Sequence, residues 1–150
     1  MLETLHDVYF WIPGSENVSP TKEVEDRKTS EKVLRSLVYR KSSDFVYIKY
    51  FKFKPDMDES CKMICLKNNI EDKVILIENE FPYNCPKGTS HYVLWYSVKK
   101  PQDDNEINND IFRCLENILG HNCFEFVWYE NPKMSIPEIF HVQVFWRIII

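Results

Sequence analysis

The chain lacks the features that would send it into a membrane or out of the cell. No run of apolar residues approaches the roughly 18 that a membrane span needs. The opening stretch, "MLETLHDVYFWIPG", carries acidic side chains where a secretion signal has basic ones. Its 5 cysteines are odd in number and irregularly spaced. We therefore expect a cytoplasmic protein with reduced cysteines and no membrane association.

An excess of positive charge is also missing. The net charge is -4, so no basic field attracts nucleic acid, which we do not expect as a partner. The sequence contains no P-loop, no GxGxxG and no Ser-His-Asp order. The cysteines and histidines lack the paired spacing of a zinc site. We expect neither a metal nor a cofactor.

What is present is ample material for one core. The chain has 150 residues, of which 44% are hydrophobic and 15% aromatic. This length and composition predict a single domain over residues 1–150. Within it we expect an N-terminal helical or extended segment at 1–43 and a sheet core at 44–150.

The hydrophobic patterns predict the following elements. Helices are expected at 20–39, as one helix or as a short and a longer one, and at 103–119, with a weak one at 59–69. Strands are expected at 44–54, 74–77, 90–98, 124–129 and 141–146, and "DVYFWIPG" is a short strand or an apolar anchor. The strand at 74–77 is expected to be buried on both faces. Because βαβ alternation does not run through the chain, the fold class is α+β with a largely antiparallel sheet and flanking helices.

The last strand, "IFHVQVFW", carries the most suggestive polar residues. Its pleat places His141 and Gln143 on one face with Ile139 and Phe145, while the other face is wholly apolar. In the catalytic interpretation this face forms the floor of a pocket, because a nucleophile needs surroundings shielded from water and a neighbouring hydrogen-bond donor. The alternative is a half-exposed face on which His141 and Gln143 meet water.

A second group of candidates surrounds the loop between two core strands. Asn79, Tyr83 and His91 could contact a ligand, with Asn79 on a sugar hydroxyl and His91 polarising a phosphate or carbonyl. The alternative is structural, because Asn favours turns and a histidine at a strand start often bonds loop backbone.

Three further candidates lie near the last strand. Asn131 and Ser135 could support a ligand site, although both can also bond their own backbone in turns. Arg147 could bind an anion, or it could be a solvated strand terminus.

Two blocks of sequence resemble the DUF3605 family, which includes an N-acetylglucosamine-induced protein. The first is "VILIENEFPYNCPKGTSHYVLW" at 74–95, which is similar to the family's Asn-x-x-Pro-Tyr, glycine loop and His-x-Val-x-Trp. Its matching residues are Asn79, Pro82, Tyr83, Gly88, His91, Val93 and Trp95. The second, "FVWYENPKMSIPEIFHVQVF" at 126–145, looks like the family's closing block.

The same order also resembles, more distantly, the histidine-triad (HIT-like) superfamily. That resemblance implies a HIT-like architecture and puts His141 at the place of the histidine that attacks a nucleotide α-phosphate. Gln143 takes the third place of the His-x-His-x-Gln form. Ile139 replaces the first histidine and is not expected to hydrogen-bond or orient a catalytic imidazole. The preceding loop, "ENPKMSIP", has no glycine to let phosphate approach the backbone.

Three functions stay open at this point. The resemblance implies a protein that binds a nucleotide or nucleotide sugar and, if active, a hydrolase or transferase that forms a nucleotidyl-histidine. An inactive scaffold acting as a protein-interaction module is the alternative. A single-strand or RNA-end binder rests on the interleaved lysines and aromatics of "YIKYFKFK", which edge strands also carry to block aggregation.

Overall fold

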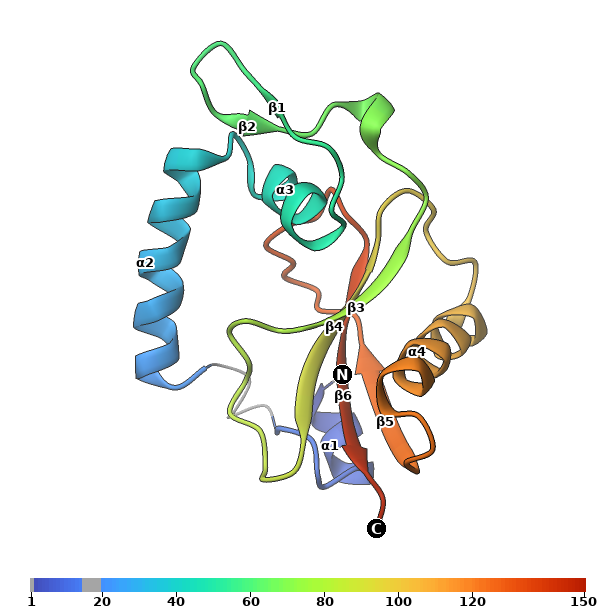
Figure 1. Ribbon diagram of the computed structural model, residues 1–150. Helices are drawn as coiled ribbons and strands as arrows, with labels where there is room; N and C mark the ends of the chain where they lie inside the picture. The colour runs from blue at the N-terminus through green and yellow to red at the C-terminus, as the bar shows by residue number, and fades with distance from the viewer. Residues whose placement is uncertain (1, 15–19) are drawn as a thin grey trace.

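A computed structural model describes residues 2–14 and 20–150 and shows one α+β domain (Figure 1). The helices are Leu2–Val8 (α1), Lys22–Val38 (α2), Ser42–Phe45 (α3) and Asp104–Leu119 (α4). The strands are Asp56–Met57 (β1), Met63–Ile64 (β2), Val74–Glu78 (β3), Ser90–Tyr96 (β4), Phe124–Tyr129 (β5) and His141–Ile148 (β6). The main sheet is antiparallel with the order β3-β4-β6-β5, and β1 pairs with β2 separately. The predicted α+β class with an antiparallel sheet and flanking helices is thereby confirmed.

The helix α4 covers one face of the main sheet, as its sequence pattern predicts. The Asp103 side chain caps its start by accepting a hydrogen bond from the Glu106 N–H at 2.9 Å. Gly120 ends it with a φ of 63°, a conformation that favours glycine. Its buried side chains form one cluster with the apolar face of β6; those on α4 are Ile107, Ile111 and Leu115.

The opposite face of the sheet is covered at its two ends by different segments. At one end lie α3 and the π-helical turn Val46–Tyr50 that continues it. At the other end lies the segment after α1 (Figure 1), and its Trp11 and Ile12 are buried in a cluster with Phe145. The polar residues of β4 and β6 therefore lie on a covered face.

The predicted strand at 44–54 is wrong, because this segment is helical as far as Tyr50. Phe45, Phe51 and Phe53 all enter one core cluster, an arrangement that suits a coiled backbone with a sharp turn. Lys52 supplies that turn with a φ of 65°, and the Phe51 and Phe53 rings stack at 5.3 Å. The three phenylalanines are thus buried, and Tyr47 and Tyr50 of the same segment are half-buried.

Two smaller expectations are wrong. The segment at 59–69 is not a helix, since it contains β2 and only a short 3-10 turn, Lys67–Asn69. The strand β3 lies at an edge of the sheet and is only half-buried, so the expected burial on both faces is wrong. For "DVYFWIPG", the apolar anchor is confirmed of the two alternatives, because Trp11 and Ile12 are buried after the end of α1.

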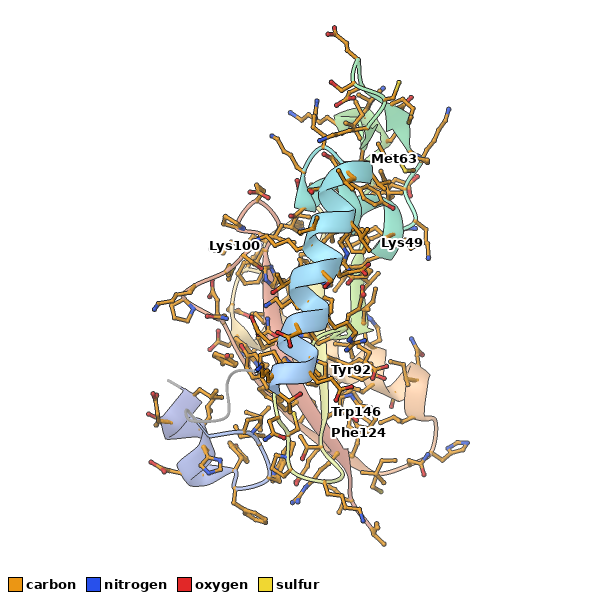
Figure 2. All side chains as sticks on the ribbon, turned by 90° about the vertical axis from the view of Figure 1, so that its left-hand side faces the viewer. Lys49, Met63, Tyr92, Lys100, Phe124 and Trp146 are labelled. Atoms are coloured by element: carbon orange, nitrogen blue, oxygen red, sulfur yellow. The ribbon has the colours of Figure 1, made fainter. Side chains whose placement is uncertain are left out.

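The helix α2 stands apart from the layers of the domain. It begins after Thr21, whose side chain accepts a 3.4 Å hydrogen bond from the Val24 N–H, and none of its residues is buried. Figure 2 shows it in the foreground with no other element in front of it. Neither α2 nor any other helix within residues 2–14 and 20–150 is long and apolar enough to cross a membrane.

Candidate functional site

The main polar candidates meet on the sheet face opposite α4. The register sets Trp95 of β4 opposite His141 of β6, Val93 opposite Gln143, and His91 opposite Phe145. Asn79 follows β3 directly, and its backbone N–H donates to the His91 carbonyl at 2.9 Å. Side chains at alternate positions of a strand share a face, so His91 of β4 and Gln143 and His141 of β6 all lie on the same face of the sheet.

His91 is held by the protein through both ring nitrogens. The Tyr83 backbone N–H donates to Nδ1 at 3.0 Å, so Nδ1 is unprotonated. Nε2 therefore carries the proton and donates to the Gln143 Oε1 at 2.6 Å. Burial lowers the pKa of His91 to about 4, against a weaker opposing effect of the Gln143 bond. The ring is neutral near pH 7, and neither nitrogen is free for a ligand.

Asn79 is fixed in the same way. Its Oδ1 accepts the Phe81 backbone N–H at 2.8 Å, which is an Asx turn. Its Nδ2 lies 3.4 Å from both the Gln143 Oε1 and the His91 Nε2. Because His91 Nε2 carries a proton, only Gln143 can accept from Asn79.

Gln143 keeps one free polar group. It is 8% exposed, so the alternative of a half-exposed strand face is wrong. Its oxygen accepts from His91 and Asn79, whereas no residue in the described part of the chain bonds its amide nitrogen. This N–H2 group is a donor that the cluster leaves for something else.

His141 differs from His91 in having one free ring nitrogen. Its Nδ1 lies 2.8 Å from the Ile139 carbonyl oxygen, so Nδ1 must donate and Nε2 keeps its lone pair. Among residues 2–14 and 20–150, none bonds to Nε2. The ring stacks on Trp95 at 4.2 Å and 27° and is 5% exposed.

The environment of His141 also keeps it neutral. Burial lowers its pKa, while the Ile139 carbonyl and the charge of Glu130 oppose that effect. The expectation that Ile139 cannot orient the imidazole was wrong, because the backbone carbonyl does what the side chain cannot. A neutral, oriented imidazole with a free Nε2 lone pair can act as a base or as a nucleophile.

Tyr83 and Asn131 form a separate polar group next to His91. The Tyr83 hydroxyl lies 2.9 Å from that of Tyr129 and accepts from the Asn131 Nδ2 at 3.4 Å. The Oδ1 of Asn131 accepts the Lys133 N–H at 3.0 Å, which is again an Asx turn. These contacts tie the β5–β6 loop to the loop that follows β3.

The structure does not bring the last two candidates to His141 and Gln143. Ser135 is exposed. Arg147 lies at the far end of β6, where its Nε donates to Glu125 at 2.5 Å and its guanidinium lies 4.9 Å from the Trp11 ring centre. A ligand role for either one remains a prediction.

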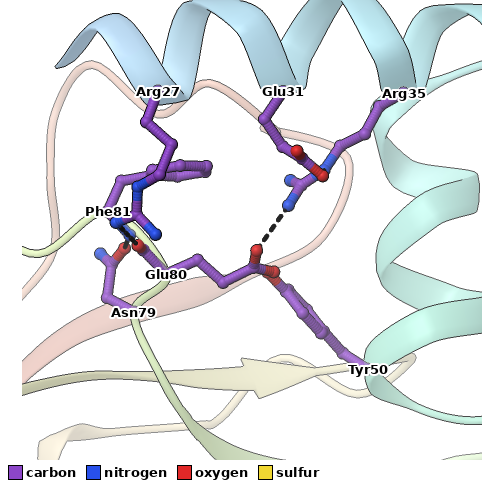
Figure 3. A network of polar contacts seen from close by, with 7 residues as sticks. All are labelled: Arg27, Glu31, Arg35, Tyr50, Asn79, Glu80 and Phe81. Atoms are coloured by element: carbon purple, nitrogen blue, oxygen red, sulfur yellow. Dashed lines mark hydrogen bonds and ion pairs between the residues drawn. The ribbon is translucent and has the colours of Figure 1, made fainter. Parts of the chain in front are cut away.

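A shallow hollow of about 450 Å³ opens beside Asn79. Its lining residues are Arg27, Glu78, Asn79, Glu80 and Pro82. The charged groups in it hold α2 in place: Arg35 donates to the Glu80 carboxylate at 2.7 Å, and Arg27 donates to the Glu80 carbonyl at 3.0 Å (Figure 3). Arg27 and Glu80 could not be recognised from the sequence, because no local pattern links a charged residue of a helix to one 53 positions away.

No group of three metal-binding side chains is found in the described part of the chain. Its cysteines are free; two are exposed, Cys61 and Cys123, and they lie far apart in the sequence.

Comparison with known proteins gives a family and a fold. A family model described as "Protein of unknown function (DUF3605)" matches residues 21–147. No curated protein matches the sequence. A solved structure described as "Crystal Structure of HTC1" has a TM-score of 0.51 and 16% identity, covering 99% of this chain and 82% of that chain. At that identity the likeness concerns the fold alone.

Proposed function

The chain belongs to the DUF3605 family, and from that premise we propose that it binds a nucleotide or nucleotide sugar at His141 and Gln143. In this proposal His141 is the nucleophile of a nucleotidyl hydrolase or transferase with a HIT-like architecture. The single observation that carries it is the fixed tautomer of His141. The Ile139 carbonyl holds the Nδ1 proton and leaves the Nε2 lone pair free.

The proposed chemistry has two steps. The Nε2 lone pair forms a bond to the α-phosphorus, and the bond from phosphorus to the bridging oxygen breaks, the leaving phosphate keeping that electron pair. Water or an acceptor hydroxyl then attacks the phosphorus, the P–N bond breaks with its electron pair returning to Nε2, and the attacking group releases its proton to solvent. The lowered pKa of His141 supports this role, because the imidazole is unprotonated at neutral pH.

Gln143 has a defined part in this proposal. Its amide nitrogen has no partner among the described residues, and its oxygen is anchored by His91. The anchored amide can donate to a phosphoryl oxygen as negative charge develops there. His91 is then a positioning residue that acts through Gln143.

A ligand can reach His141 only if the residues that cover its side chain move. The residue is 5% exposed, and the β5–β6 loop places Ile136 and Ile139 in the adjoining apolar cluster. The proposal therefore requires that this loop shifts when a ligand binds.

The test is incubation with a panel of nucleoside triphosphates and nucleotide sugars. Product formation, thermal shift and intact mass are measured for wild type, His141→Ala and His121→Ala. His121 is exposed, so its variant is the matched control. We expect a nucleotidyl adduct in wild type and His121→Ala and none in His141→Ala. No turnover, no thermal shift and no adduct across the panel would refute the proposal.

A second candidate is a catalytically inactive interaction protein. It is favoured by large apolar side chains that are exposed on helical surfaces, including Leu34 at 58% and Leu37 at 68%. This function predicts that His141→Ala leaves partner binding unchanged, as measured by pull-down and calorimetry with the partner.

A further inference from the structure

One carboxylate, that of Glu80, joins three segments that are far apart in the sequence (Figure 3). One of its oxygens accepts from Arg35 of α2 at 2.7 Å, and the other accepts from the hydroxyl of Tyr50 in the π-helical turn. Glu80 itself belongs to the loop that follows β3, and its carbonyl accepts from Arg27 of α2 at 3.0 Å. Arg35, Tyr50 and Glu80 thus form a clasp between the helix, the turn and the loop.

The turn on one side of the clasp belongs to the layer that packs over His141. The Tyr50 ring lies 6.0 Å from the Trp95 ring, and Trp95 stacks on the His141 imidazole at 4.2 Å. Arg35 reaches the same layer, because its guanidinium lies 3.7 Å from the centre of the Phe45 ring. The clasp therefore holds down the segment that covers Trp95 and His141.

The loop on the other side of the clasp contacts Gln143. Asn79, the residue before Glu80, places its Nδ2 3.4 Å from the Gln143 Oε1. This bond is longer than a typical N–H···O bond, so Asn79 is the weaker partner of Gln143, whose oxygen lies 2.6 Å from His91. Asn79 also lines the open hollow of about 450 Å³, together with Arg27 and Glu80. It thus contacts the hollow on one side and Gln143 on the other.

The clasp is a local structure of low stability. None of α2 is buried, and the side chains of Arg35 and Glu80 are 23% and 38% exposed, so water competes for their bond. Segments with few buried contacts open locally at a smaller free energy than the whole domain. The sheet beneath is held by the ladders that β4 forms with β3 and β6. The clasp can therefore open while the sheet stays folded.

We propose that the clasp is a gate to the sheet face that carries His141 and Gln143. Its opening separates the turn from the loop and admits a small molecule from the hollow, past Asn79, to Gln143 and His141. It also gives a role to α2, which buries none of its own residues and supplies the Arg35 that closes the gate. For the ligand that enters, the gate rests on the proposed function, whereas its opening involves no reaction.

The test measures how fast diethyl pyrocarbonate modifies each histidine, by peptide mass spectrometry after timed pulses near neutral pH. The reagent acylates a neutral imidazole nitrogen, which His141 offers at Nε2. In wild type we expect fast modification of the exposed His121 and slow modification of His141. Glu80→Ala should raise the His141 rate at least about fivefold, because the clasp loses both bonds to the carboxylate. His91, which has no free nitrogen, should stay slow in both proteins.

Two further variants separate the gate from a general loosening of the domain. Glu125→Ala removes a carboxylate of similar exposure, 36% against 38%, from its pair with Arg147 at the far end of β6. It should leave the His141 rate at the wild-type value. Tyr50→Phe removes only the hydroxyl that reaches Glu80 and keeps the ring, and it should raise the His141 rate.

An unchanged His141 rate in Glu80→Ala would overturn the gate. A rise that Glu125→Ala reproduces, or that His91 shares, would also overturn it, because either result indicates loosening of the whole domain. An unchanged rate in Tyr50→Phe would overturn the part assigned to the turn. No nucleotide takes part in this measurement. A protein that forms no nucleotidyl adduct but shows the gated rate would therefore refute the proposed function and support the gate.

Discussion

Protonating His91 should destabilise the fold, because its two nitrogens have partners that fit only the neutral ring. Nδ1 accepts from the Tyr83 N–H, and Nε2 donates to Gln143. A second proton on Nδ1 would face the Tyr83 N–H, so one hydrogen bond becomes a repulsion. The ring is 3% exposed and stacks on Phe145 at 4.6 Å, so water cannot solvate the added charge.

The size of the effect follows from the pKa of His91, which burial lowers from 6.5 to about 4. Above pH 6.5 the ring is neutral in both the folded and the unfolded chain. As the pH falls below 6.5 the unfolded chain binds a proton first, so the free energy of unfolding decreases until the folded ring also titrates. The shift corresponds to a loss of about 3 kcal/mol between about pH 7 and pH 4.

Urea denaturation followed by circular dichroism measures this loss at several pH values. The comparison is between wild type and His91→Asn, whose amide oxygen can still accept from the Tyr83 N–H. Carboxylates titrate in both proteins, so the difference between their pH dependences isolates His91. His121→Asn, at an exposed position, should keep the wild-type dependence. If wild type and His91→Asn lost the same free energy, to within about 1 kcal/mol, the assignment of His91 as a buried neutral histidine would be refuted.

Three further substitutions, one of them with a matched control, probe the packing of α4 and α2. Tyr96→Phe removes the 2.6 Å hydrogen bond from the Tyr96 hydroxyl to the buried Asp110. We expect it to cost about 2 kcal/mol in urea denaturation, and a loss below about 0.5 kcal/mol would contradict this. Leu115→Ala removes a side chain with 0% exposure and should lower the free energy of unfolding by about 2–5 kcal/mol. Ile118→Ala, at an exposed position, should lower it by less than about 1 kcal/mol. Equal losses for the two variants would contradict the orientation of α4, with Leu115 toward the sheet and Ile118 toward solvent. Glu80→Gln should speed amide exchange in α2 with less than about 1 kcal/mol of global destabilisation, and unchanged α2 exchange would show that other contacts hold the helix.

Local patterns were sufficient for some elements and insufficient for others. α4 was predictable because its caps, Asp103 and Gly120, and its apolar spacing all agree. The segment at 44–54 was mispredicted because its β-branched and aromatic residues favour a strand by propensity. Its actual form is set by packing, since a helix and the turn at Lys52 let Phe45 and Phe51 reach the same cluster.

The candidate site shows the same division. The pleat of the last strand fixed that His141 and Gln143 share a face, since alternation is a property of any strand. Which histidine has a free nitrogen could not be predicted. The partners of His91 are Tyr83 and Gln143, and Gln143 is 52 positions away. The partner of His141 is a backbone carbonyl, and residue type does not reveal where a carbonyl points.

The sequence by itself determined the family, the α+β class, the strands and helices with strong local signals, and the polar face of β6. Only the tertiary structure decided that this face is covered, that His91 is bonded at both nitrogens, and that α2 leaves Val33 and Leu37 exposed. The physical reason is that periodicity and capping act within one element. Burial, hydrogen-bond partners and the side of a helix that faces the domain depend on segments brought together by folding.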